Sequence, residues 1–331
     1  MFKKINSIEN LYEATRNAVR SKRDREDIAE YLLNLESNIE NLNQDLCSHN
    51  YKHGKYKLFH IIDPKPRIIS KASIRDRVVH HAVHDVIYPM IDNSFIYDSY
   101  SCRIGKGTHR AIKRAQKWSR TYRYAIHLDI VQYFNSIDRG VLKTLLTKWI
   151  KDEDVLWLLN EIIDSSSQID KYRECGLPLG NLTSQFFANI YLNELDQFVK
   201  HTLRIKPYVR YMDDILILGD DKKVLLEIAF RIKDFVKENL ALDFHEKGFQ
   251  PFPVNRGIAF LGFRIYPFYR KVLPKGINRF RNRLKKLKRD YENGLIPVEK
   301  VTQSIQSSIA FLDFGNTGKV KKELLRNYVL C

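Results

Sequence analysis

The sequence predicts an α+β fold in which amphipathic helices pack beside an antiparallel sheet. Four short apolar runs have the residue types of strands: 124–130, 207–211, 215–218 and 258–265. The second and third runs are joined through Met212, Asp213 and Asp214, which indicates a hairpin with two acids at its tip. Three longer segments have apolar residues at helical spacing: 26–46, 186–199 and 221–242. This spacing predicts helices that each bury one face in a core.

One more helix is expected over residues 72–91, where Pro89 closes it because proline has no amide hydrogen. This segment contains His80, His81 and His84. An i, i+4 pair of these histidines could bind a metal, but no third ligand follows at the spacing of a zinc site. We therefore interpret the three histidines as ordinary residues of the polar face of this helix.

The composition indicates a packed globule whose partner is a polyanion. The chain has 331 residues, with 56 Lys and Arg against 39 Asp and Glu, and a formal net charge of +17. Hydrophobic residues make up 44% and aromatic residues 12%, which excludes a disordered basic tail. No window is apolar enough for a spanning helix, and the N-terminus lacks the apolar segment of a signal peptide. These features predict a cytoplasmic protein.

The distribution of the cysteines and of the basic residues indicates which ligands the protein can bind. The four cysteines are scattered without a CxxC pair, so a metal ion would have to bind to carboxylates. Residues 99–128 contain eight Lys or Arg and no acid, and residues 270–289 contain ten and no acid. A charged run is usually a solvated face, but such faces normally mix signs. We therefore interpret both runs as walls of a nucleic-acid groove.

Three aspartates are the candidate catalytic residues. Asp213 and Asp214 are adjacent acids between two apolar strands, where their mutual repulsion calls for a cation. Asp129 ends another apolar strand, and if the strands are neighbours the three carboxylates converge. Oxygen ligands of this kind suit Mg²⁺, and two such ions can promote an in-line displacement at phosphorus. The alternative is that Asp213 and Asp214 are simply turn residues.

The motifs resemble those of reverse transcriptases. The resemblance covers roughly residues 50–290 and rests on these segments, in chain order: KPRII at 65–69 with RDR at 75–77, SCRIGKG at 101–107, HLDIVQYF at 127–134, GLPLGNLTSQ at 176–185, YMDD at 211–214 and FLGF at 260–263. It implies a right-hand polymerase fold with fingers, a palm that carries the antiparallel sheet, and a helical thumb. The domains expected are 1–122 for the N-terminal extension and fingers, 123–270 for the palm with an insertion near 140–175, and 271–331 for the thumb.

Within that superfamily the chain is most similar to the reverse transcriptases of diversity-generating retroelements. Most reverse transcriptases have Gln where this chain has Leu179 and Pro where it has Gln185, and the LGNLTSQ pattern resembles the diversity-generating form. The resemblance implies RNA-directed DNA synthesis with frequent errors opposite template adenines. It also implies dNTPs, a template-repeat RNA, an RNA/DNA heteroduplex and a small basic accessory variability protein as partners.

The resemblance assigns a role to individual residues. It implies that Asp129, Asp213 and Asp214 hold two Mg²⁺ ions, with the Ile130 carbonyl as an extra ligand. The residues it places at the incoming dNTP are Lys65, Arg67, Arg75, Phe134, Leu179, Gly180 and Gln185. Those it places at template and primer are Arg103, Lys106, Gly107, Tyr211, Met212 and Gly262. Lys247 is the candidate general acid for the departing pyrophosphate, although a surface role is an open alternative.

Two other functions stay open on the sequence. A retron-like or defence-associated reverse transcriptase would have the same chemistry but would copy its own structured RNA faithfully. A catalytically idle RNA-binding module would keep the fold alone, and the three intact aspartates argue against it. An aromatic residue at Phe134 blocks a 2′-hydroxyl sterically, which disfavours an RNA-dependent RNA polymerase.

Overall fold

The computed structural model describes residues 1–62, 66–168 and 174–328, and they form two compact units. The first unit contains residues 1–97, 130–205 and 231–245, and the second contains 98–129, 206–230 and 246–331. No helix in the described part of the chain is long and apolar enough to cross a membrane.

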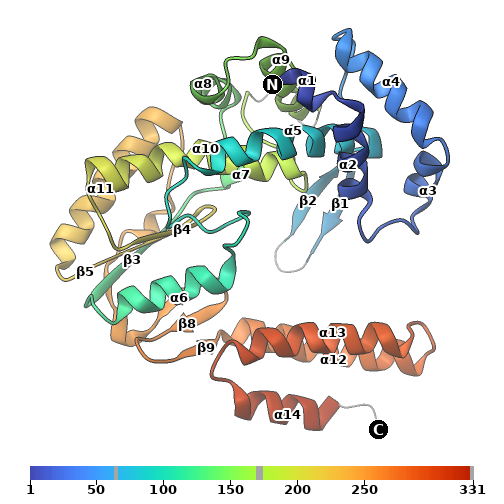
Figure 1. Cartoon of the computed structure of the whole chain (residues 1–331). Helices are drawn as coiled ribbons and strands as arrows, with labels where there is room; N and C mark the ends of the chain where they lie inside the picture. Colours follow the sequence, from blue (N-terminus) through green and yellow to red (C-terminus); the bar gives the residue numbers. More distant parts are fainter. Residues whose placement is uncertain (63–65, 169–173, 329–331) are drawn as a thin grey trace. The chain divides into compact units, whose positions relative to one another are not determined.

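The first unit is mainly helical (Figure 1). Its helices are α1 (Phe2–Ile5), α2 (Ile8–Val19), α3 (Glu26–Leu33), α4 (Leu35–Cys47), α5 (Ile74–Asp92), α7 (Tyr133–Ser136), α8 (Arg139–Trp149), α9 (Glu153–Asp164), α10 (Leu182–Gln197) and the second half of α11 (Lys222–Leu240). Its strands are β1 (Lys57–Ile61) and β2 (Arg67–Lys71), which form an antiparallel hairpin.

The core of the first unit is built on α5, which packs against both α2 and α10 through buried apolar side chains. The hydroxyl of a serine caps the N-terminus of two of these helices: Ser7 accepts from the amide of Asn10, and Ser73 accepts from the amide of Asp76.

Two expectations about this region were wrong. The helical pattern over 26–46 is divided between α3 and α4 at Asn34.

The second correction concerns Pro89, which does not close α5. The helix continues to Asp92 because the proline lies in its last turns, where it removes a single backbone hydrogen bond. The residues around it, Ile87, Tyr88 and Ile91, are buried, so packing of this end supports the helical conformation.

The second unit contains two antiparallel sheets and the C-terminal helices. Its strands are β3 (Tyr124–Asp129), β4 (Tyr208–Tyr211), β5 (Asp214–Gly219), β6 (Phe252–Pro253), β7 (Ile258–Phe260), β8 (Phe263–Ile265) and β9 (Arg270–Val272). Its helices are α6 (Thr108–Ser119), the first half of α11, α12 (Pro274–Glu292), α13 (Val298–Asp313) and α14 (Gly318–Tyr328). The hairpin predicted from the runs 207–211 and 215–218 is confirmed by the pairing of β4 with β5, whereas the single strand expected over 258–265 is two strands, β7 and β8.

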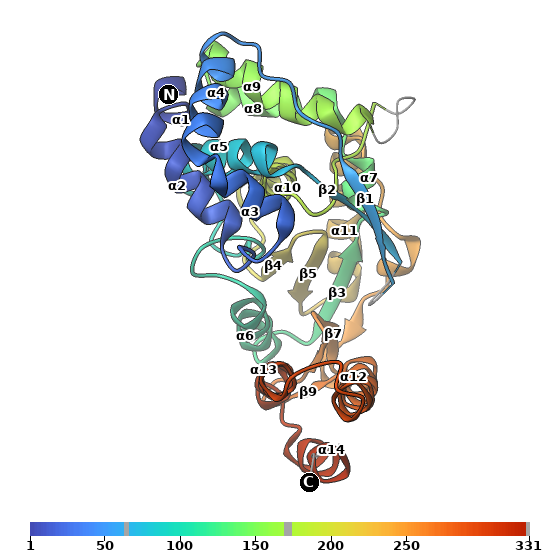
Figure 2. The same ribbon diagram turned by 90° about the vertical axis from the view of Figure 1, so that its right-hand side faces the viewer.

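The four-stranded sheet has the order β4-β5-β3-β6, and Figure 2 shows its strands β4, β5 and β3 in this order. One face carries Ala125, Val209, Leu216 and Leu218, which join the apolar residues of α6 in a buried cluster. Successive side chains of a strand point to opposite faces, so the residues next to these four in sequence lie on the other face of the sheet. The register therefore fixes which side chains meet at each end of this sheet.

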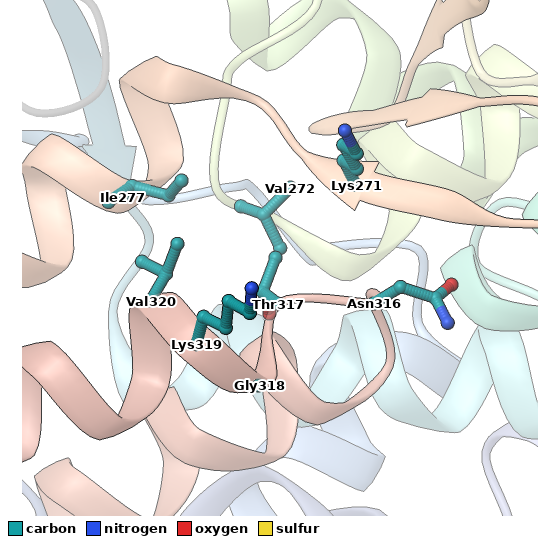
Figure 3. A pocket seen from close by; sticks show the side chains of 8 residues that line it. All are labelled: Lys271, Val272, Ile277, Asn316, Thr317, Gly318, Lys319 and Val320. Atoms are coloured by element: carbon teal, nitrogen blue, oxygen red, sulfur yellow. The ribbon is translucent and has the colours of Figure 1, made fainter.

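The C-terminal helices α12 and α13 lie side by side (Figures 1 and 2). Eight of the 19 residues of α12 are Lys or Arg, and Phe280 and Leu284 are its buried residues. A hollow of about 610 Å³ near the start of α14 is lined by Lys271, Val272, Ile277 and residues 316–320 (Figure 3). Its lining contains no acid, so this hollow is not a candidate for the metal-binding chemistry expected from the sequence.

Candidate active site

The three aspartates lie at one end of the β4-β5-β3-β6 sheet, all within the second unit. Asp129 and Asp214 are directly opposite one another in the antiparallel pairing of β3 and β5. Cross-strand partners have their side chains on the same face of a sheet, so these two carboxylates share a face. Asp213 precedes Asp214 in the turn that joins β4 to β5. The three side chains are all partly exposed.

The turn between β4 and β5 is tight and strained. Tyr211 pairs with Asp214, which leaves Met212 and Asp213 as a two-residue loop. Met212 has a φ of 56°, in the left-handed region that a side chain with a Cβ disfavours. Such a conformation costs on the order of 1 to 3 kcal/mol and persists where the surroundings impose it. The hydroxyl of Thr108 at the start of α6 donates to the hydroxyl of Tyr211 at 3.1 Å.

His127 is a site residue that the sequence analysis missed. Its Nε2 lies 3.0 Å from Oδ1 of Asp214. The side chain stands two positions before Asp129 on β3, and period-two alternation places both on the same face. That alternation was the available signal, because a polar residue two positions from a strand-end carboxylate must face the same site.

The donor chemistry of the three aspartates fits a divalent ion with oxygen ligands. The backbone positions of the three aspartates also fit such an ion, since Asp129 and Asp214 are cross-strand partners and Asp213 is next to Asp214. In the described residues, however, no three His, Cys, Asp or Glu side chains are gathered closely enough to hold a metal ion. Asp214 is turned to His127, so an ion held by all three carboxylates would require side-chain rotation.

A separate hollow lies in the first unit and contains two of the predicted dNTP residues, Arg67 and Leu179. It has a volume of about 630 Å³ and is lined by Leu58, His60, Pro66, Arg67, Ile68, Ser70, Asn135, Ser166 and 175–179. A site of this size suits a small organic ligand. The wall near Leu179 is apolar, and the exposed guanidinium of Arg67 supplies a positive charge.

Leu179 is held in place by the hairpin strand β2. Its carbonyl accepts a hydrogen bond from the amide of Ser70 at 2.9 Å. The side-chain amide of Asn181 donates to the carbonyl of Ser70 at 3.2 Å. Between them, Gly180 has a φ of 105°, and a Cβ there would lie 2.7 Å from Cγ2 of Ile69. Glycine at this position is therefore required both by the backbone and by the close approach of β2.

Phe134 and Gln185 also belong to the first unit but do not line the hollow. The carbonyl of Phe134 accepts from the amide of Leu177 at 2.8 Å, and its half-buried ring is tilted against Tyr133. Its neighbour Asn135 does line the hollow. Gln185 lies in the first turn of α10 and is half-buried.

The expected role of Arg75 at the triphosphate is not supported by its contacts. Its guanidinium forms an ion pair with Asp45 of α4 and lies over the ring of Tyr51, 4.9 Å from the centroid. Asp76, beside it, is buried and accepts from the hydroxyl of Tyr51 at 2.8 Å. This part of the motif stabilises the start of α5. Lys65 lies outside the described residues.

The predicted template and primer residues are distributed over three loops of the second unit: the loop before α6, the turn between β4 and β5, and the turn between β7 and β8. Gly107 precedes α6 with a φ of 99°, and its amide donates to the carbonyl of Tyr100. In the same loop Arg103 donates to the carbonyl of Ser99 at 3.0 Å, and the ammonium of Lys106 lies 5.2 Å from the ring centroid of Tyr100.

Gly262 lies in the turn between β7 and β8, where Leu261 and Gly262 both have positive φ. Two such residues in succession are the pattern of a type I′ hairpin turn. The carbonyl of Gly262 accepts from the amide of Leu273, just before α12, at 2.9 Å. The glycine therefore joins the small β7-β8-β9 sheet to the start of the C-terminal helices.

Lys247 is exposed in a short 3-10 turn, Glu246–Gly248. A Cβ on Gly248 would lie 2.9 Å from the carbonyl oxygen of His127. The turn is therefore packed directly on β3, two residues before Asp129. This placement brings the backbone of Lys247 to the strand that carries the first aspartate.

A comparison with protein families decides the classification. Residues 52–265 match the family model described as reverse transcriptase (RNA-dependent DNA polymerase). The chain belongs to the reverse transcriptase family. The matched range includes the three aspartates and His127 at the end of the sheet, and also Arg67 and Leu179 of the first-unit hollow.

Curated relatives from group II introns and related sources resemble this reverse transcriptase. It is 28% identical over 138 residues to the group II intron-encoded protein LtrA of Lactococcus lactis subsp. cremoris, covering 41% of this chain and 23% of LtrA. It is 25% identical over 242 residues to protein YkfC of Escherichia coli K12, covering 61% and 63%. An uncharacterized 91 kDa protein in the cob intron of Schizosaccharomyces pombe is 27% identical over 155 residues, or 46% and 19%. The match spans less than two thirds of each relative.

Solved structures support the fold. The apo telomerase of Candida tropicalis has a TM-score of 0.52 at 12% identity, covering 83% of this chain and 58% of that one. A telomerase of Candida albicans bound to a fragment of telomeric RNA has a TM-score of 0.50 at 10% identity, covering 86% and 58%. The right-hand polymerase fold expected from the sequence, with helices and an antiparallel sheet, is confirmed.

Proposed function

We propose that this reverse transcriptase is an RNA-directed DNA polymerase that joins dNTPs to a primer on an RNA template. The observation that carries the proposal is the cross-strand pair Asp129 and Asp214 with Asp213 in the adjoining turn. Carboxylates placed together at the end of an antiparallel sheet are the protein's contribution to a site for divalent ions. The domain ranges stated for fingers, palm and thumb belong to the same proposal.

Different residues would have different roles in nucleotidyl transfer. Asp129, Asp213 and Asp214 would hold two Mg²⁺ ions, with the carbonyl of Ile130 as an added ligand. When bound, such ions lower the pKa of the primer 3′-hydroxyl and stabilise charge on the pyrophosphate leaving group. The guanidinium of Arg67 would bind triphosphate oxygens bidentately. Lys247 would supply a proton to the leaving group.

Selection of the sugar and of the base is assigned to the first unit. The half-buried ring of Phe134 would exclude a 2′-hydroxyl by steric overlap, which favours dNTPs over NTPs. Leu179 would present apolar surface where a glutamine side chain would offer hydrogen bonds to the incoming nucleotide. Fewer polar contacts give a weaker check on base-pair geometry. We infer from this an error-prone enzyme of the diversity-generating type, which makes adenine-mutagenised cDNA.

Basic surface residues support a nucleic-acid substrate. The exposed face of α12 has many Lys and Arg, and phosphate contacts made by such a face weaken as salt rises. Template RNA and the RNA/DNA heteroduplex are the proposed ligands of this surface. A small basic accessory protein and a cytoplasmic location remain predictions from the resemblance.

The test is primer extension by the purified protein on a mixed-sequence RNA template with Mg²⁺ and dNTPs, followed by sequencing of the cDNA. We expect extension that Asp213→Asn abolishes and that Asp24→Asn, at an exposed acid in the N-terminal part of the first unit, leaves intact. Errors concentrated opposite adenines support the diversity-generating type. Faithful cDNA would favour the retron-like alternative, and no extension even with cognate RNA and accessory protein would favour the idle module.

A further inference from the structure

Arg210 has the largest fully buried side chain among the described residues, with 0% exposure. It lies on β4, immediately before the Tyr211–Asp214 turn. A buried guanidinium requires several hydrogen-bond acceptors, because its five N–H groups leave water on folding. The location of these acceptors indicates what the side chain holds.

The guanidinium of Arg210 contacts the strained turn directly. Its Nη1 donates to the carbonyl of Met212 at 3.1 Å, and its Nη2 donates to the hydroxyl of Ser99 at 3.0 Å. The carbonyl of Met212 belongs to the residue with the left-handed φ of 56°. The fork therefore ties the tip of the two-residue loop to the segment that contains Ser99.

The backbone of Arg210 is fixed to the same segment. Its amide donates to the carbonyl of Asp98 at 2.9 Å, and its carbonyl accepts from the amide of Tyr100 at 3.0 Å. Residues 98–100 thus extend along β4 and form a parallel bridge between Ser99 and Arg210. These backbone hydrogen bonds fix the position from which the side chain of Arg210 reaches the turn.

The side chain of Arg210 lies on the opposite face of the sheet from Asp214 and Asp129. Arg210 pairs with Ile215, whereas Tyr211 pairs with Asp214, and successive residues of a strand point to opposite faces. Arg210 therefore does not compete with an ion or a phosphate for the carboxylates. It contacts the backbone of the turn, at the carbonyl of Met212, from the face opposite to the carboxylates.

We propose that Arg210 is a positioning residue that holds the Met212–Asp213 turn in its left-handed conformation and so fixes the Asp213 carboxylate. The proposal deepens the polymerase function and rests on it. A lysine at this position keeps the charge but loses the planar fork that reaches two acceptors at once. Misplacement of a catalytic group by about 1 Å can lower the rate on the order of a hundredfold.

The principal test compares Arg210→Lys with wild type in two measurements. In steady-state primer extension we expect kcat to fall at least about tenfold while the KM for dNTP changes less than about twofold, because the turn carries the reacting carboxylate and not the nucleotide pocket. In hydrogen–deuterium exchange of the protein alone, we expect faster exchange confined to the peptide that covers residues 208–215.

Arg114→Lys is the matched control. Arg114 also uses a two-pronged guanidinium, with Nε 2.7 Å and Nη2 3.2 Å from the carboxylate oxygens of the buried Asp98. Its fork binds Asp98, one residue before Ser99, so the control measures the effect of losing a fork that holds the same segment through Asp98 and not through the carbonyl of Met212. An equal fall of kcat in Arg114→Lys and Arg210→Lys would overturn the proposal.

A double-mutant cycle with Met212→Gly tests the cause. Glycine adopts a positive φ without a steric penalty, so the turn then depends less on the guanidinium. We expect Arg210→Lys to lower kcat by a smaller factor in the Met212→Gly background than in wild type. An equal factor in both backgrounds would overturn the proposal.

Ser99→Ala provides a milder variant in case Arg210→Lys does not fold. It removes the acceptor of Nη2, and we expect a smaller fall in kcat with faster exchange in the 208–215 peptide. Unchanged exchange in that peptide would overturn the proposal. Absence of any extension by wild type would count against the polymerase function instead, and the exchange measurement would still decide the role of Arg210.

Discussion

His127 and Asp214 face one another across β3 and β5, with Nε2 of the imidazole 3.0 Å from Oδ1 of the carboxylate. A hydrogen bond to a charged group is worth about 1.5 to 3 kcal/mol, so it selects one orientation of the Asp214 side chain. The imidazole is thus part of the site, although the sequence analysis assigned no role to His127 within the HLDIVQYF motif at 127–134.

Replacing His127 by alanine should lower kcat for primer extension by about tenfold, because Asp214 loses the donor that orients it. His127→Gln should retain more activity, since its amide nitrogen can donate from a similar position. Steady-state kinetics at saturating primer and template measure both variants. Equal activity of His127→Ala and wild type would show that the contact has no part in catalysis.

Gly180→Ala should destabilise the protein by about 2 kcal/mol, because alanine disfavours a positive φ and its methyl would meet Ile69. The same substitution at Gly318 is the control, since a Cβ there has nothing within 4 Å and the position begins α14. Denaturant unfolding measures the difference. A loss at Gly180 no greater than that at Gly318 would contradict the close packing of β2 on residues 179–181.

Leu179→Gln should lower the frequency of errors opposite template adenines, because the amide adds hydrogen-bonding groups to an apolar wall of the first-unit hollow. Leu58→Gln is the matched control, an identical substitution in the same hollow on β1. Sequencing of cDNA made by each variant gives the error spectrum. If the adenine errors persist in Leu179→Gln, or fall equally in Leu58→Gln, the assignment to Leu179 is wrong.

Most of the sheet and its acidic end could be predicted from the sequence, because apolar strands bounded by turn residues leave a local pattern. The Asp213–Asp214 hairpin and the strand ending at Asp129 were predicted in this way and are confirmed. The apolar pattern over 258–265 predicted one strand, and only the resemblance of FLGF to a primer-grip turn indicated a turn at Gly262. Leu261 has a positive φ, which the residue type leucine does not indicate.

Contacts between distant segments left no such pattern. Arg75 looked like a phosphate ligand, but its partner Asp45 is thirty residues away in the chain. The buried pair of His53 and His80 was missed for the same reason, and His80 was assigned to a polar face. Only the packed chain brings these groups together, so propensity and spacing could not indicate their pairing.

The pair of His53 and His80 predicts how stability depends on pH. The Nδ1 of His53 lies 2.7 Å from the carbonyl of Gly54, which can only accept, so this nitrogen carries a hydrogen. When both rings are neutral, Nε2 of His53 is an acceptor and Nε2 of His80 donates to it at 3.2 Å. Burial, and next the proximity of His53, lowers the pKa of His80 to about 3.

Because the pKa of His80 is lower in the folded chain than in the unfolded chain, the unfolded state binds the extra proton below about pH 6.5. The free energy of unfolding should therefore be greatest above that pH and should fall on acidification, by up to about 1.4 kcal/mol per pH unit from this group. Burial also lowers the pKa of His81, which adds to the slope. The pKa of Asp76 is lowered from an already acidic value, so its effect begins below about pH 4.

Urea unfolding of His80→Gln between pH 4.5 and 7 tests this expectation. Glutamine keeps an amide donor near the position of Nε2 but cannot be protonated in this range, so the slope of stability against pH should decrease. His81→Gln is the matched control on the same helix and should decrease the slope less, because His81 is less completely buried. An unchanged slope in His80→Gln would mean that the imidazole is protonated in the folded protein and that the described pair is not its structure in solution.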